Sequence, residues 1–281
     1  MSLRPSQVVG RAASYLERHG VESPTPTAEV LLASVLGTDR AGLYSRAEGM
    51  SAQEAKLFGR ALCRRCTGTP AQHLTGEQGF RRILLSVRPG VFVPRPETEV
   101  VVEAAIEVVD SSGVAEPIVV DLGTGTGAIA LSLKDERPAT RVFATDLSLQ
   151  AVALARENAS DLGLDVEVFE GDLLEPLPDG LRGRLDLVVS NPPYVAPEDA
   201  DTLPPEVRAD PPLALFGRLD LYERLFREAA RWLRPGGSIV LEVGETQGAA
   251  VSAAAEAAAF VDIVVRPDLA GRDRVVTGRR P

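Results

Sequence analysis

Cysteine, methionine and tryptophan are scarce in this sequence of 281 residues, which contains two, two and one of them respectively. Cys63 and Cys66 form a Cys-x-x-Cys pair, a spacing that occurs in redox motifs and in half of a zinc site. No second pair of ligands stands nearby, and the surrounding residues are predicted to be helical, so we interpret both cysteines as structural. A protein without disulfides is therefore expected, as is typical of the cytoplasm.

Long apolar runs are also lacking: none approaches the ~20 residues that a membrane span needs. The N-terminal segment has no apolar signal-peptide core. We therefore expect a cytoplasmic protein with no membrane association. The net charge of −10 is unevenly distributed, because residues 1–94 hold 12 Lys and Arg against 7 Asp and Glu, whereas residues 95–281 hold 18 against 33. The acidic part disfavours stable nucleic-acid binding, and the basic part can contact an acidic partner or can simply be a solvated surface.

Residues 1–75 show helical patterns and predict a small helical bundle that could dock a substrate. Apolar residues recur at helical spacing from Val8 to Leu16. Thr27 can cap a second helix that Gly37 would end, and a capping box at Ser51 to Glu54 opens a third. Residues 76–94 then predict a β-hairpin linker.

Residues 95–281 alternate between strand and helix patterns after an initial helix from about Glu97 to Val109. This alternation predicts an α/β domain with a mostly parallel, seven-stranded, Rossmann-like sheet. The expected strands are 118–121, 141–145, 166–170, 185–190, 238–243, 261–266 and 274–278, and the expected helices are 128–136, 149–162, 219–233 and 246–258.

A glycine-rich turn joins the first of these strands to its helix in the segment DLGTGTGAIAL. Its glycines allow a sharp turn and a close approach of the backbone to a ligand, and the helix N-terminus presents free N–H groups. The pattern predicts a nucleotide-type cofactor, either a methyl donor or NAD. The candidate residues are Gly123, Thr124, Gly125, Thr126 and Gly127.

Two acidic residues follow at the ends of the next strands. Asp146 can accept both hydroxyls of a ribose, or it can cap the following helix. Asp172 can accept an adenine amino group, with Leu173 against the ring. Asp121 adds negative potential that suits a sulfonium cation.

The segment NPPYVAP predicts the reacting site, because Asn191 ends the fourth strand at the carboxyl edge, where such sheets bind ligands. Pro192 and Pro193 end strand pairing and leave carbonyl groups free, and Tyr194 offers a flat face to a planar group. The Asn191 side-chain oxygen and the Pro192 carbonyl can each accept one N–H of a planar NH2 group. This arrangement favours methylation of such a nitrogen through positioning and electrostatics.

Four segments together closely resemble the PrmC/HemK family of release-factor N5-glutamine methyltransferases: DLGTGTGAIAL, NPPY, VRPGVFVPRPETE and DLAGRDRVVTGR. The resemblance implies a helical N-terminal domain, a hairpin and a class I methyltransferase domain that binds S-adenosylmethionine through Gly123–Gly127, Asp146, Asp172–Leu173 and Asn191. It implies that residues 191–194 hold the glutamine of the Gly-Gly-Gln loop of class I peptide chain release factors, the expected protein partners. Arg95, Pro96, Glu97 and Thr98 would lie near the active centre, with Arg95 and Glu97 as substrate-binding candidates.

The sequence departs from the family pattern around Arg218, where a glycine and an Asp-Gly step are replaced, which affects the expected substrate more than the chemistry. Three alternatives therefore stay open. The chain could methylate another protein or a small amide, or an amino group of a nucleic-acid base, which it would have to flip into the pocket. It could also be a non-enzymatic module whose basic N-terminal segment docks a translation factor. Separately, the charge asymmetry predicts that the N-terminal domain docks the substrate, with Arg60, Arg64 and Arg65 as the patch to test.

Overall fold

The computed structural model describes residues 3–281 and divides into two compact units. The helical unit comprises the described residues up to Glu77 together with Pro204–Ala209, and the sheet unit comprises Gln78–Leu203 and Asp210–Pro281. Among the described residues, no helix is long and apolar enough to cross a membrane. The two cysteines are unpaired thiols, Cys63 exposed and Cys66 half-buried.

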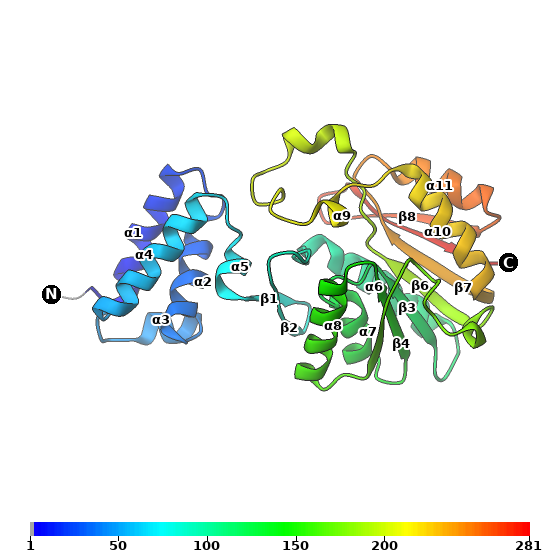
Figure 1. Cartoon of the computed structure of the whole chain (residues 1–281), viewed down its shortest axis with the longest axis horizontal. Helices are drawn as coiled ribbons and strands as arrows, with labels where there is room; N and C mark the ends of the chain where they lie inside the picture. Colours follow the sequence, from blue (N-terminus) through cyan, green and yellow to red (C-terminus); the bar gives the residue numbers. More distant parts are fainter. Residues whose placement is uncertain (1–2) are drawn as a thin grey trace. The chain divides into compact units, whose positions relative to one another are not determined.

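The helical unit contains α1 (Pro5–Arg18), α2 (Pro24–Leu36), α3 (Arg40–Ser45), α4 (Ala52–Cys66) and α5 (Ala71–Thr75) (Figure 1). The predicted capping box opens α4, since the Ser51 side chain accepts from the Glu54 backbone N–H and the Glu54 carboxylate accepts from the Ser51 N–H. Gly37 ends α2 in the left-handed conformation, as predicted. Apolar faces of α1, α2 and α4 form the core of this unit, around Leu16, Leu31 and Phe58.

The helical unit differs from the sequence-based expectations in three respects. Helix α2 begins at Pro24 and contains Thr27, because a proline in the first turn has a suitable φ and no N–H to satisfy. The short helices α3 and α5 were not predicted, since helices of six and five residues give too little periodicity. The predicted Arg60–Arg64–Arg65 patch also needs correction: Arg65 is buried and forms an ion pair with Glu206, whereas Arg60 and Arg64 are exposed.

The predicted hairpin consists of β1 (Glu77–Phe80) and β2 (Ile83–Ser86), and it is followed by η1 (Pro96–Thr98) and α6 (Glu99–Ser111). The main sheet has seven strands in the order β5-β4-β3-β6-β7-β9-β8. They are β3 (Ile118–Leu122), β4 (Arg141–Asp146), β5 (Val166–Glu170), β6 (Leu185–Ser190), β7 (Leu233–Glu242), β8 (Val261–Pro267) and β9 (Asp273–Arg279). The first five pair in parallel, and β9 is antiparallel to both β7 and β8. The predicted seven-stranded fold class is confirmed.

Helices cover both faces of this sheet, as the near-continuous apolar strands require. One face packs against α6, α7 (Ala128–Glu136) and α8 (Leu149–Leu162). The other packs against α10 (Leu219–Trp232) and α11 (Gly248–Ala257), which lie together on one side of the sheet in Figure 1. Between β6 and α10 the chain forms η3 (Pro197–Thr202) and α9 (Pro212–Leu215), and η2 (Asp179–Leu181) precedes β6. The helices cover the two faces of the sheet, so the loops that follow the five parallel strands surround its carboxyl edge. The candidate site lies at this edge.

Candidate functional site at the carboxyl edge of the sheet

The glycine-rich turn after β3 has backbone angles that residues with a Cβ rarely adopt. Gly123, Gly125 and Gly127 all have positive φ, at 69°, 58° and 87°. A Cβ at Gly127 would lie 2.8 Å from Leu131 Cδ1, so the turn also needs glycine for space. The turn therefore presents mainly its backbone to a ligand.

The two threonines of this turn point into the protein. The Thr124 hydroxyl donates to Asp121 Oδ2 at 2.6 Å, and both Thr124 and Thr126 are buried. The backbone carbonyl of Thr126 accepts from the Asn158 side chain at 2.9 Å. The Thr124 side chain and the Thr126 backbone carbonyl thus both fix the shape of the turn.

Asp121 is fully buried beneath the same turn. Burial raises the pKa of its carboxyl to about 7, against the lowering effect of hydrogen bonds from Thr124 and from the Ala130 N–H. The second carboxyl oxygen, Oδ1, has no hydrogen-bond partner among the described residues. The site therefore contains a carboxylate whose charge a nearby cation would stabilise.

Asp146 ends β4 and is held in place by the backbone. Its Oδ2 accepts from the Gly125 N–H at 2.9 Å and its Oδ1 from the Ser148 N–H at 2.8 Å. Ser148, not Asp146, is the N-cap of α8. Burial raises the pKa of Asp146, in opposition to these two bonds. Each oxygen keeps a lone pair, so the carboxylate can still accept a pair of hydroxyls.

Asp172 and Leu173 form the turn after β5. Asp172 makes a 2.8 Å ion pair with Arg224 of α10, which fixes its direction. Leu173 has a φ of 47°, a conformation that a side chain with a Cβ adopts at a cost of order 1–3 kcal/mol. Such strain is concentrated at ligand sites, and local sequence patterns do not predict it.

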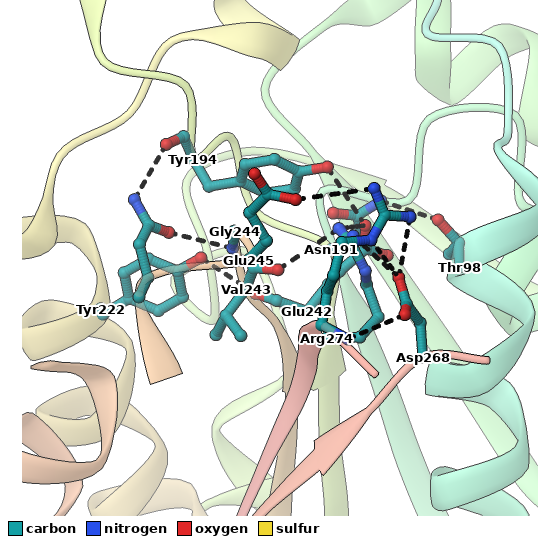
Figure 2. Close-up of polar contacts among 12 residues, drawn as sticks. Thr98, Asn191, Tyr194, Tyr222, Glu242, Val243, Gly244, Glu245, Asp268 and Arg274 are labelled. Carbon is teal, nitrogen blue, oxygen red and sulfur yellow. Dashed lines mark hydrogen bonds and ion pairs between the residues drawn. The ribbon is translucent and has the colours of Figure 1, made fainter. Parts of the chain in front are cut away.

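The segment Asn191–Tyr194 follows β6, whose last residue, Ser190, is bonded through its hydroxyl to the Leu122 carbonyl at 2.7 Å. Figure 2 shows how the side chains are held. Asn191 Nδ2 donates to Thr98 Oγ1 at 3.1 Å, and the Tyr194 hydroxyl donates to Glu242 Oε1 at 3.4 Å. The Tyr194 carbonyl accepts from Gln247 Nε2 at 3.0 Å. Since the Asn191 amide donates to Thr98, its oxygen is available to an incoming N–H group.

The segment after Tyr194 is held by residues that precede α10. The Val195 N–H donates to the Leu215 carbonyl and the Gly217 N–H donates to the Val195 carbonyl, both at 3.0 Å. A Cβ at Gly217 would lie 1.8 Å from the Pro193 carbonyl oxygen. Arg218, the unusual residue of this region, is largely exposed and lies 3.7 Å from Glu198. Gly217, unlike its neighbour Arg218, thus lies directly against the Pro193 carbonyl.

Arg95 and Glu97 have different surroundings. Arg95 forms an ion pair with the buried Asp210, whose Oδ1 also accepts from the Val93 N–H at 3.2 Å. The pKa of the Tyr194 hydroxyl is raised to about 12, chiefly by burial and by the charge of Glu242. Glu97, which is half-buried, adds a smaller effect in the same direction. Arg95 is thus anchored, and Glu97 contributes negative potential beside the tyrosine.

Residues far apart in the sequence complete this edge of the sheet, and composition and spacing did not single them out. Glu242 ends β7, and Arg274 of β9 lies 4.0 Å from it and 3.3 Å from Asp268. No group of three or more His, Cys, Asp or Glu residues within 3–281 is arranged to hold a metal ion.

The fold and the turn define the class: a seven-stranded sheet with a glycine turn after its first strand and Asn-Pro-Pro-Tyr after its fourth is the architecture of class I methyltransferases. Residues 85–204 match the methyltransferase small domain family, and residues 7–76 match the PrmC N-terminal domain. The chain is 45% identical to the release factor glutamine methyltransferase of Moorella thermoacetica, over 98% of this chain and 97% of that one. It is 42% identical to that of Deinococcus radiodurans, over 100% and 99%. The chain belongs to the release factor glutamine methyltransferase family.

Solved structures of other methyltransferases share the fold at low identity. The T. thermophilus 16S rRNA N2 G1207 methyltransferase, solved with AdoMet and guanosine, superposes with a TM-score of 0.55 at 22% identity, over 73% of this chain and 50% of that one. The hMettl16 catalytic domain, solved with MAT2A 3′UTR hairpin 6, gives 0.56 at 13%, over 83% and 85%. These structures support the fold alone.

Proposed function

We propose that this protein transfers a methyl group from S-adenosylmethionine to the side-chain amide N5 of the glutamine in the Gly-Gly-Gln loop of class I peptide chain release factors. Near full-length similarity to release factor glutamine methyltransferases supports the substrate. One structural observation supports the proposed chemistry. The Asn191 amide nitrogen donates to Thr98, so the Asn191 side-chain oxygen can accept an N–H of the substrate.

The residues at the carboxyl edge fit S-adenosylmethionine, which when bound supplies an electrophilic methyl group on a positively charged sulfur. Asp121 and Asp146, both with raised pKa values, provide a negative environment that a cation would relieve. We assign cofactor binding to the turn Gly123–Thr124–Gly125–Thr126–Gly127, to Asp146, to Asp172 and Leu173, and to Asn191. Family membership favours this cofactor over NAD.

The reacting amide is a weak nucleophile, because its nitrogen shares its lone pair with the carbonyl group. Asn191 Oδ1 and the Pro192 carbonyl would each accept one N–H of the substrate amide, which orients the nitrogen and stabilises the positive charge that develops on it. Pro193 and Tyr194 would contact the flat amide group. Glu97, and Arg95 from its position fixed by Asp210, would complete the substrate surface. The proton can leave to solvent after transfer, so a strong general base is not required.

The test is mass spectrometry of a recombinant class I release factor after incubation with this protein and S-adenosylmethionine. We expect one added methyl group on the Gly-Gly-Gln glutamine, and its loss with Asn191→Ala. Pro197→Ala, at an exposed position in the same loop, is the matched control and should keep the activity. Methyl transfer to rRNA or DNA, with none to the release factor, would show the proposed substrate to be wrong.

A further inference from the structure

A buried carboxylate at the end of β7 has no part in the mechanism above. The Glu242 side chain is 2% exposed, and Figure 2 shows it close to Asn191, Tyr194 and Arg274. Its Oε1 accepts from the Tyr194 hydroxyl at 3.4 Å, and Oε2 has no hydrogen-bond partner among the described residues. A buried oxygen without a hydrogen bond costs free energy, so a nearby hydroxyl is expected to donate to this carboxylate.

The Thr98 hydroxyl is a candidate for this role, and it also contacts Asn191. The Thr98 hydroxyl interacts with the Glu242 carboxyl and lowers its pKa, while its oxygen accepts from Asn191 Nδ2. A hydroxyl has one proton. If that proton is directed to Glu242, the oxygen lone pairs face Asn191, and only the amide nitrogen of Asn191 can be bonded there. In that case the carboxylate would determine which way round the Asn191 amide stands.

The charged and titratable groups around Glu242 come from four other elements. Arg274 of β9 lies 4.0 Å away and is itself paired with Asp268. Glu97 of η1, Tyr194, and Tyr222 of α10 also act on it electrostatically, and the Tyr222 hydroxyl donates to the Glu242 backbone carbonyl at 2.9 Å. Burial outweighs Thr98, Arg274 and Tyr194 and raises the pKa of Glu242 to about 7.

We propose that Glu242 is a positioning residue for methyl transfer, which sets the amide orientation of Asn191 through Thr98 and holds the Tyr194 ring through its hydroxyl. This proposal rests on the proposed function. One buried group therefore fixes both ends of the segment that would hold the substrate amide. When Glu242 is protonated it becomes a donor to Thr98, and the preference for one orientation of Asn191 is lost.

The kinetic test compares Glu242→Gln, Thr98→Val and the double variant in release-factor methylation. We expect each single change to lower kcat on the order of tenfold to a hundredfold, because the Asn191 amide loses its fixed orientation. The double variant should be no slower than the slower single one, because both act through one path. Thr98→Ser, which restores the hydroxyl, should recover most of the loss. Glu256→Gln, on the exposed surface of α11, is the matched control.

The pH profile is a second readout. The wild-type rate should fall as the pH drops below about 7, and this decline should be smaller in Glu242→Gln, where Asp121 alone of the two carboxyls still titrates in that range. Additive losses in the double variant, or an unchanged acid limb in Glu242→Gln, would overturn the proposal.

A third readout does not depend on the release factor. In ¹⁵N-labelled protein, the Asn191 side-chain amide signals are those lost in Asn191→Asp. Glu242→Gln should shift these signals and Glu256→Gln should not; unmoved signals would contradict the proposal. If the wild type fails to methylate the release factor, the proposed function is wrong, and the amide signals still decide the role of Glu242.

Discussion

Gly217 touches the proposed substrate-binding segment more closely than any side chain would allow. Its ideal Cβ position lies 1.8 Å from the Pro193 oxygen and 2.7 Å from the Pro193 carbonyl carbon. These are backbone atoms of a rigid proline pair, so they cannot move aside as the tip of a flexible side chain would. The shape of the Asn-Pro-Pro-Tyr segment thus depends on a residue far along the chain with no reactive group.

We predict that Gly217→Ala lowers kcat for release-factor methylation by tenfold or more, on the order expected for an ångström-scale displacement of a positioning group. Gly180→Ala is the matched control, because nothing lies within 4 Å of its added Cβ. Steady-state kinetics of the two variants make the comparison. Equal rates would show that the Pro193 carbonyl can move without consequence.

Some site residues could be read from the sequence, and others could not. The glycine turn and Asn191 follow strands directly and stand in local patterns, so their place at the sheet edge could be predicted. Glu242 and Arg274 could not be recognised, since each looks like an ordinary strand residue. The contacts of Glu242 with Tyr194 and with Arg274 form only because β7, β9 and the Tyr194 segment meet in the folded chain.

At the scale of elements, local sequence rules worked where the pattern was complete. Helices α7 and α8 and strands β5 and β6 were predicted with their observed bounds. Strand β7 begins at Leu233, five residues before the expected Ser238, because Leu-Arg-Pro-Gly-Gly has turn-forming residues. Pairing of Leu233 with Leu185 past an irregularity extends the strand, which is a tertiary effect that local patterns miss.

Helix α4 provides a prediction at this scale. Ser51→Ala removes the acceptor for the Glu54 N–H and should lower the free energy of unfolding of the helical unit by about 1 kcal/mol. Gln53→Ala, at an exposed position in the first turn of the helix, is the control. Urea titration followed by the far-ultraviolet helix signal would measure both. An equal effect of the two changes would contradict a capping role for Ser51.

At the scale of the molecule, buried carboxyls predict how stability depends on pH. The pKa values of Asp121 and Glu242 are raised to about 7 in the folded chain, from ordinary values of 3.8 and 4.5. The folded state therefore binds more protons than the unfolded state between these limits, and stability should fall as pH rises from about 5 to about 7. Asp121→Asn should flatten this slope in denaturant titrations, and the exposed Asp165→Asn should not. A slope unchanged by Asp121→Asn would show that this carboxyl is not protonated on folding.

Charge on the helical unit gives a further prediction, which rests on the proposed role of this unit in docking the release factor. Arg60 and Arg64 are exposed on α4, whereas Arg65 is held by Glu206. Arg60→Glu together with Arg64→Glu should raise KM for the release factor and leave kcat nearly unchanged, because uniform binding is lost. Arg182→Glu with Arg184→Glu, on exposed positions of the sheet unit, is the control. Unchanged KM in the α4 variant would remove this patch from the docking surface.

The helical unit is built from two separate stretches of the chain, since Pro204–Ala209 belongs to it and Glu206 pairs there with the buried Arg65. Loss of the acceptor would leave a buried guanidinium uncompensated, which is costly. Recombination between two related genes with a single crossover near Glu77 would take residues 1–77 from one parent and residues 204–209 from the other. Arg65 and Glu206 would then come from different parents. In a lineage that shuffles its domains, viable chimeras should therefore carry both stretches from the same parent, and positions 65 and 206 should be inherited as a pair.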